Sequence, residues 1–216
     1  MSIQAVRAEP LDMEALLRQV RIVPVLVIER AVDAVPLARA LVAAGLRVLE
    51  ITLRTPAALG AVRAIQREVP DAVVGTGTVL EPADLIRSRA AGARFAFSPG
   101  FTPELLAAAR GGDLPFIPGV ATPAEIMQAR AQGFRLLKFF PAEQMGGVAA
   151  LKAHWGPIPD VRFCPTGGLG AHNIKEYLAQ PNVVAIGGGF PAPPADIAAG
   201  RWDAIRAHAT ALRAQL

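Results

Sequence analysis

A lysine lies in the middle of a short apolar segment, where lysine is seldom found. In residues 135–140, Lys138 shares one face of an extended chain with Leu136 and Phe140. Apolar surroundings penalise the charged form of an amine, and a neutral amine can attack a carbonyl to form a Schiff base. The alternative is a lysine at an outer strand edge whose ammonium reaches the solvent. The segment predicts a candidate nucleophile and leaves that alternative open.

A second apolar segment carries an acid and a cation. In residues 47–54, Glu50 and Arg54 fall on the same face of an extended chain. Glu50 could act as a general acid–base facing Lys138, or it could form an ion pair with an arginine. Arg54 comes at the end of the segment, and its planar guanidinium could bind a substrate carboxylate.

Glycines follow the last two apolar segments of the chain. Gly167 and Gly168 come after one, and Gly187, Gly188 and Gly189 end the other. Glycine lets backbone N–H groups approach a phosphate closely, although tight turns alone would also explain such clusters. Their joint position favours a phosphate site in the last two loops of a barrel.

Few other side chains suggest chemistry. Cys164 is expected to be a small buried apolar residue rather than a nucleophile. His154, His172 and His208 have no metal-ligand spacing, so we expect no metal and no other cofactor.

Short apolar segments bounded by glycine or proline recur along the chain and predict buried strands. They are residues 22–28, 47–53, 72–78, 93–98, 115–120, 135–140, 161–165 and 183–188. Amphipathic stretches separate them, and a further helix is expected at residues 12–20. This alternation predicts an α/β fold, a (β/α)8 TIM barrel with an extra N-terminal helix, in which residues 1–216 form a single domain. An open doubly wound sheet is the alternative.

Helix start and stop signals support these boundaries. Three Thr-Pro pairs, at Thr55, Thr102 and Thr122, place a hydroxyl at a helix N-cap and a proline at the first helical position. Glu125 completes a capping box with Thr122. The expected helix ends are Gly45, Gly92, Gly111 and Gly133.

The composition excludes several classes of protein. Apolar residues make up 52% and charged residues 19% of the 216, which is too apolar for a disordered chain. The net charge of +4 is spread along the chain and aromatic residues are only 6%, so no nucleic acid partner is expected. No apolar run is long enough for a membrane span, and Met1 to Val20 carry three acidic residues unlike a signal peptide. We expect a cytoplasmic protein.

Five ordered motifs resemble those of one enzyme family. They are EITLRT (50–55), GTGTVL (75–80), SPG (98–100), KFFPAE (138–143) and RFCPTGG (162–168). The chain resembles, over nearly its whole length, the 2-dehydro-3-deoxy-6-phosphogluconate (KDPG) and 4-hydroxy-2-oxoglutarate (KHG) aldolases. These are class I, Schiff-base aldolases, the former belonging to the Entner–Doudoroff pathway.

The resemblance implies a homotrimeric barrel that needs no metal. It would cleave a phosphorylated keto acid, KDPG, to pyruvate and D-glyceraldehyde 3-phosphate. The residues to which the resemblance gives a role are Lys138 (Schiff base), Glu50 (proton transfer), Arg54 and Thr78 (pyruvate carboxylate), Pro99 and Phe140 (pocket lining), and Thr166, Gly167 and Gly168 (phosphate end). Gly188 and Gly189 are also assigned to the phosphate site, because they lie at the end of the last apolar segment.

The chain departs from the family pattern at three places. Thr76 stands where alanine is common, Gly189-Phe190 replaces a usual Ser-Trp, and residues 169–172 form an unusual loop. The alternatives within the family are KHG cleavage, without phosphate, and the galactonate-series aldolase. Outside it, a phosphosugar isomerase or epimerase barrel and a non-catalytic barrel that binds a phosphorylated ligand would share the glycine loops.

Overall fold

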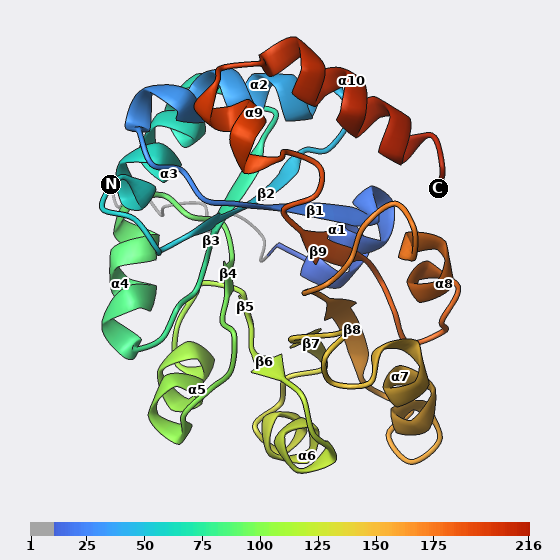
Figure 1. The fold of residues 1–216 in the computed structure, drawn as a ribbon. Helices are drawn as coiled ribbons and strands as arrows, with labels where there is room; N and C mark the ends of the chain where they lie inside the picture. The colour runs from blue at the N-terminus through green and yellow to red at the C-terminus, as the bar shows by residue number, and fades with distance from the viewer. Residues whose placement is uncertain (1–10) are drawn as a thin grey trace, which may run out of the picture.

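The computed structural model describes residues 11–216, in which parallel strands alternate with helices (Figure 1). The expectation that no signal peptide is present concerns a segment whose residues 1–10 lie outside this description. Within residues 11–216, no helix has the length and apolar character needed to cross a membrane.

All of the strands pair in parallel. They are β1 (Ile22–Leu26), β2 (Val48–Thr52), β3 (Val73–Gly77), β4 (Ala96–Phe97), β5 (Phe116–Ile117), β6 (Gly119–Val120), β7 (Leu136–Phe139), β8 (Arg162–Pro165) and β9 (Ile186–Gly188). The helices are α1 (Met13–Val20), η1 (Ala31–Asp33), α2 (Ala34–Ala43), α3 (Ala58–Glu68), α4 (Pro82–Ala90), α5 (Pro103–Arg110), α6 (Pro123–Ala131), α7 (Gly147–Trp155), α8 (Ile174–Leu178), α9 (Pro194–Ala198) and α10 (Trp202–Arg213).

The strand order describes a curled sheet. One sheet runs β5-β4-β3-β2-β1-β9, so the last strand lies beside the first, and a second sheet runs β6-β7-β8. Two isolated parallel bridges, Phe163 with Val183 and Thr166 with Gly187, connect β8 to the segment of β9. Each strand of the larger sheet therefore lies beside its predecessor, which is not the order of the doubly wound alternative.

Several predicted strands are shorter in the structure. The segment at 115–120 is divided into β5 and β6 around Pro118, because proline has no N–H to donate to a neighbouring strand. The segments at 93–98 and 183–188 retain only two and three strand residues, β4 and β9. The predicted order of strands and helices is nevertheless the one observed.

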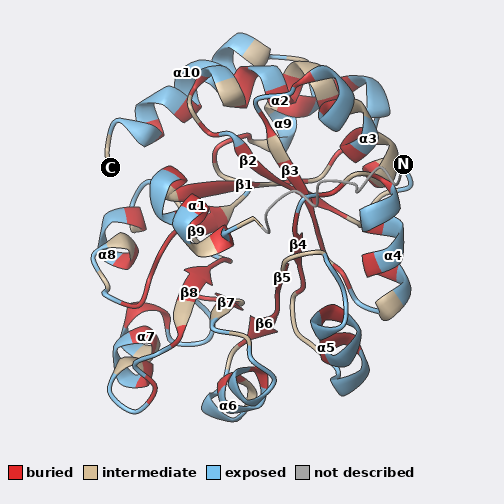
Figure 2. Ribbon diagram, turned by 180° about the vertical axis from the view of Figure 1, so that it is seen from behind, coloured by how far each residue is buried: buried red, intermediate tan, exposed pale blue. Residues whose placement is uncertain are grey.

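Two apolar layers separate the inside of the curled sheet from its outside. Val23, Val48, Phe95 and Phe97 belong to an inner cluster, and Leu17 of α1 packs into the same cluster. The surrounding helices bury their inward faces against the outer side of the strands and expose their outer faces (Figure 2). Since α1 leads directly into β1, it covers the inner cluster at the amino ends of the strands. It does not cover the carboxyl ends.

Most of the predicted helix signals are confirmed. The N-H of Leu105 donates to the Thr102 hydroxyl, and Thr122 and Glu125 form the expected capping box. The prediction for Thr55 is wrong, because its hydroxyl donates to the Ile28 carbonyl at 2.6 Å and α3 begins at Ala58. The expected helix ends at Gly45, Gly92 and Gly133 have positive φ, while Gly111 caps α5 in a right-handed conformation.

Candidate active site

The central feature of the inner layer is a buried ion pair. Lys138 on β7 and Glu50 on β2 lie 88 residues apart in the chain, yet Nζ donates to Oε1 at 2.9 Å. Only 6% and 2% of these two side chains are exposed. Lys138 is therefore inside the curled sheet, and the alternative of a lysine reaching solvent from an outer edge is wrong.

A glycine on β3 makes room for the glutamate. A Cβ on Gly77 would lie 2.0 Å from Oε1 of Glu50, so any larger residue would displace the carboxylate. Gly77 pairs in register with Thr52, and Glu50 pairs with Gly75. Gly77 was not identified from the sequence as part of the site. A glycine inside a strand, which often marks close approach of another group, is the signal that could have found it.

Two aromatic rings lie near the lysine nitrogen. Nζ is 5.4 Å from the centroid of Phe97 and 5.5 Å from that of Phe140. A cation above an aromatic face is attracted by the ring quadrupole. Phe140 had been expected to line the pocket, whereas Phe97 was not identified. Its position on an apolar strand, alternating with Phe95, was the available signal.

Cys164 is the neighbour of Lys138 on β8. The two residues pair in register, and Cys164 is buried. Burial, together with the negative charge of Glu50, raises the pKa of the thiol to about 12. The thiol is therefore protonated at neutral pH, and its burial confirms the prediction of a small buried side chain.

Arg54 and Thr78, expected to bind the carboxylate, follow β2 and β3 at their carboxyl ends, and Pro99, expected to line the pocket, follows β4. Arg54 is exposed and has no ion pair with any carboxylate in the part of the chain that the structure describes. Thr78 has φ of 59°, in the left-handed region. The backbone of Pro99 lies so close to Gly119 that a Cβ there would come within 2.2 Å of the Pro99 carbonyl carbon. All three lie at the same end of the strands as Lys138.

The glycines expected to bind phosphate meet at the carboxyl ends of β8 and β9. Thr166 pairs with Gly187, and a Cβ on that glycine would lie 2.4 Å from the threonine Oγ1. Gly167 and Gly168 have φ of 103° and 77°, which favour glycine. Backbone N–H groups in glycine loops of this kind can bind an anion.

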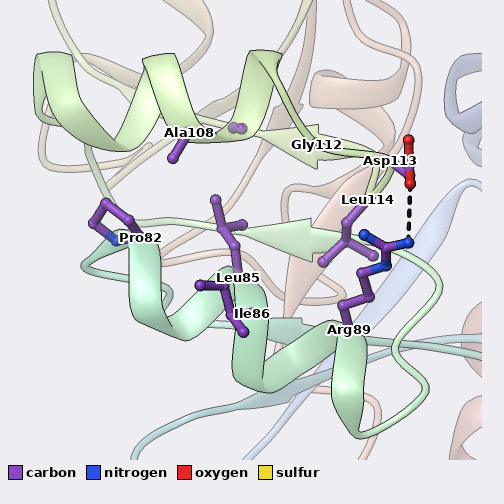
Figure 3. A pocket seen from close by; sticks show the side chains of 9 residues that line it. Pro82, Leu85, Ile86, Arg89, Ala108, Gly112, Asp113 and Leu114 are labelled. Carbon is purple, nitrogen blue, oxygen red and sulfur yellow. Dashed lines mark ion pairs between the residues drawn. The ribbon is translucent and has the colours of Figure 1, made fainter.

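An apolar cavity lies away from this cluster. It has a volume of about 220 Å³ and lies between α4 and α5, where Leu85, Ile86 and Ala108 line it (Figure 3). An ion pair of 2.9 Å between Arg89 and Asp113 lies at its rim. None of its lining residues belongs to the expected site. Among residues 11–216, no three histidine, cysteine or acidic side chains are grouped as metal ligands.

Comparison with known proteins agrees with the resemblance of the motifs. The family model described as KDPG and KHG aldolase matches residues 13–208. The chain belongs to the KDPG and KHG aldolase family. Its relatives include a 2-dehydro-3-deoxy-phosphogluconate aldolase of Pseudoalteromonas atlantica, 52% identical over 184 residues, which are 85% of this chain and 86% of the relative.

Two further members of the KDPG and KHG aldolase family are similarly close. The KHG/KDPG aldolase of Escherichia coli is 50% identical over 192 residues, covering 89% of this chain and 90% of its own. The crystal structure of the Legionella pneumophila KDPG aldolase has a TM-score of 0.90 and 44% identity, over 92% of this chain and 97% of that one. It holds pyruvate as a covalent carbinolamine intermediate.

Proposed function

We propose that the chain is a class I aldolase, a lyase that cleaves KDPG to pyruvate and D-glyceraldehyde 3-phosphate through a Schiff base on Lys138. The observation that carries the proposal is the buried contact of 2.9 Å between Lys138 Nζ and Glu50 Oε1. It pairs a nucleophile with a group that can take and return its proton. The covalent carbinolamine of the Legionella pneumophila relative supports the same chemistry.

Glu50 can prepare the amine for attack. It accepts the proton of the Lys138 ammonium across their hydrogen bond, which leaves a neutral amine and a neutral acid. The amine attacks the C2 ketone of the substrate, and the proton that the nitrogen then loses moves to the carbonyl oxygen to give a carbinolamine. Glu50 returns its proton to the departing hydroxyl, so water leaves and an iminium forms.

The iminium then accepts the electrons of the C3–C4 bond. Glu50, again a carboxylate, takes the proton of the C4 hydroxyl, directly or through a water. The bond breaks to give an aldehyde and an enamine. Glu50 returns the proton to C3 of the enamine, and hydrolysis of the resulting iminium releases pyruvate and frees Lys138. One acid–base group can serve every step because its protonation state alternates.

The residues around the pair are assigned to the two ends of the substrate. Arg54 and Thr78 bind the carboxylate and keep C2 near Nζ, while Pro99 and Phe140 line the pocket. The phosphate is bound by backbone N–H groups, because the residues at this end of the site are mainly glycines and none has a charged side chain. The residues assigned to the phosphate end are Thr166, Gly167, Gly168, Gly188 and Gly189.

KHG is a second substrate to test, because the matching family model and the Escherichia coli relative both name it. It has no phosphate, so its cleavage would not depend on the glycines after β8 and β9. The buried pair of Lys138 and Glu50 argues against an isomerase, an epimerase or a non-catalytic barrel, in which a lysine at this position would have no task.

We also propose a closed (β/α)8 barrel that forms one domain and assembles as a homotrimer in the cytoplasm. The two bridges between β8 and the β9 segment, and the continuity of β5 and β6 around Pro118, support closure. Sedimentation analysis should give about three times the chain mass of 22.6 kDa. A sedimenting species of one chain mass would contradict the trimer.

The test of the function is pyruvate release from KDPG and from KHG by the purified protein. Borohydride added with pyruvate should inactivate the enzyme and attach the pyruvate carbons to Lys138. The chain has two other lysines, Lys152 and Lys175, and peptide mapping that places the adduct on either one would refute the assignment. A chelator should leave activity intact, and loss of activity that a metal restores would overturn the Schiff-base mechanism.

A further inference from the structure

We propose that Phe97 is a positioning residue for the Schiff-base nitrogen: its ring stabilises the cationic states of Lys138 and fixes the place of Nζ opposite Glu50. The inference rests on the proposed aldolase function and adds to it a residue with no role in the motifs described above. Its basis is the 5.4 Å between Nζ and the centroid of the Phe97 ring.

Phe97 is held more firmly than the other ring near Nζ. It is fully buried, whereas Phe140 is partly exposed. The ring of Phe95 meets Phe97 edge-on, with centroids 5.6 Å apart and an interplanar angle of 87°. Gly75 in turn leaves room for Phe95, because a Cβ there would lie 2.4 Å from its Cδ2.

The topology brings Phe97 to the level of the ion pair. Inside a barrel, side chains from alternate strands form one layer. Glu50 on β2, Phe97 on β4 and Lys138 on β7 come from alternate strands, with the β5–β6 segment between the last two. The intervening strands have glycine beside these side chains: a Cβ on Gly77 of β3 would lie 2.0 Å from Glu50 Oε1, and Gly119 of β6 pairs with Lys138. The larger side chains therefore meet without obstruction.

The Phe97 ring stabilises the positive charge on the Lys138 nitrogen. Lys138 is an ammonium before attack and an iminium nitrogen during cleavage, and both carry positive charge that an aromatic face attracts. A buried charge gains most from such contact because it has lost its water. Removal of the ring should therefore make both the ammonium and the iminium less stable. A leucine of similar shape has no aromatic face and cannot replace this effect.

The other ionisable groups around Lys138 are few. Glu50 faces it from β2 and Cys164 from β8, while β6 contributes Gly119, which does not titrate. His154 on α7 packs against Phe139, whose side chain points to the other face of β7. Substitution of Phe97 leaves these ionisable neighbours unchanged. A change in the pH profile of the reaction at Lys138 can therefore be attributed to the lost ring.

The experiment measures the adduct formed from pyruvate and cyanoborohydride as a function of pH. Hydride adds to the iminium carbon and leaves a stable secondary amine on Lys138, which mass spectrometry quantifies. In Phe97→Leu, loss of the cation–π contact should lower the midpoint of the pH profile by about half to one unit and lower the plateau rate about three- to tenfold.

Phe163→Leu is the matched control. Phe163 is also a buried phenylalanine, and it pairs with Leu137 beside Lys138, but it lies in the outer cluster of the core. The control loses similar apolar area and should keep the wild-type midpoint. Phe97→Met, which fills the space without a ring, should reproduce the shift if Phe97→Leu does not fold.

The outcomes separate this inference from the proposed function. If the wild-type protein forms no adduct on Lys138, the aldolase function itself fails. If the wild type is trapped and the Phe97 variants keep its midpoint, only the positioning role is overturned. The same holds if Phe163→Leu shifts the midpoint equally, or if neither Phe97 variant folds, since Phe97 would then serve only the core.

Discussion

At the scale of single residues, the ion pair of Glu50 and Lys138 can be tested by removing its titrating acid. Glu50→Gln keeps the shape and can still accept the hydrogen bond from Nζ, but it cannot take a proton. Acid–base catalysis by one side chain contributes roughly 10²–10⁴-fold, so the turnover of KDPG should fall by about that factor. Steady-state pyruvate release measures this, and trapping of pyruvate by borohydride should fall less. A variant with more than half of wild-type turnover would show that Glu50 is structural.

Gly189 offers a second test at this scale, because a serine there would add a hydroxyl near the phosphate. Gly189 is exposed, its φ is not positive, and a Cβ would lie 3.5 Å from the Val25 carbonyl, an ordinary contact. Hydrogen bonds to charged groups contribute roughly 1.5–3 kcal/mol, of which imperfect packing removes part. Gly189→Ser should raise kcat/KM for KDPG about threefold or more and leave KHG unchanged. An unchanged ratio of the two substrates in a folded variant would mean that the backbone alone recognises phosphate.

At the scale of elements, β3 controls the position of the acid on β2. Gly77→Ala would place a methyl group 2.0 Å from Glu50 Oε1 and should move the carboxylate away from Nζ. We expect kcat to fall at least tenfold with a smaller change in KM, because Arg54 and Thr78 still bind the substrate. Comparison of kcat and KM with the wild type measures the effect. A fully active variant would show that Glu50 has other workable positions.

Gly60 in α3 is the matched control for that substitution. A Cβ at Gly60 meets no atom within 4 Å, and the residue lies inside a helix. Alanine in a helix interior is about 1 kcal/mol more favourable than glycine, so Gly60→Ala should raise the melting temperature without changing kcat. The two Gly→Ala changes thus differ in what surrounds the added methyl group.

At the scale of the whole molecule, the buried thiol links stability to alkaline pH. Burial holds the pKa of Cys164 near about 12, whereas an unfolded chain has an ordinary value close to 9.0. The pKa of the thiol is higher in the folded protein than in the unfolded chain. The contribution of Cys164 to the free energy of unfolding is therefore fully present below about pH 9 and is lost as the pH rises toward about 12. Between these values the unfolding free energy of Cys164→Ala should fall less steeply than that of the wild type, as denaturant titrations at several pH values would show. Equal slopes would contradict the assigned burial.

The helices and strands, and most of the reactive side chains, could be predicted from the sequence. Apolar segments bounded by glycine and proline located every strand, and Lys138, Glu50 and Arg54 stood out because charged residues are unusual within or directly after such segments. Local sequence was a weaker guide where backbone hydrogen bonding depends on distant partners. Pro118 divides a strand, and Thr55 bonds to Ile28 instead of capping a helix, since the carbonyl it finds belongs to another loop.

Which of these residues come into contact depends on how the strands are arranged in space. The contact of Glu50 and Lys138 joins strands that lie 88 residues apart. It depends on the curl of the sheet and on the glycines of β3 and β6 that leave the interior open at that level. Phe97 and Gly77 carry no reactive group, and the strand patterns that mark them do not say which side chain lies against them. Their roles depend on which groups are next to them in space. An aromatic face stabilises only a cation that lies against it, and a glycine makes room only for the side chain packed beside it.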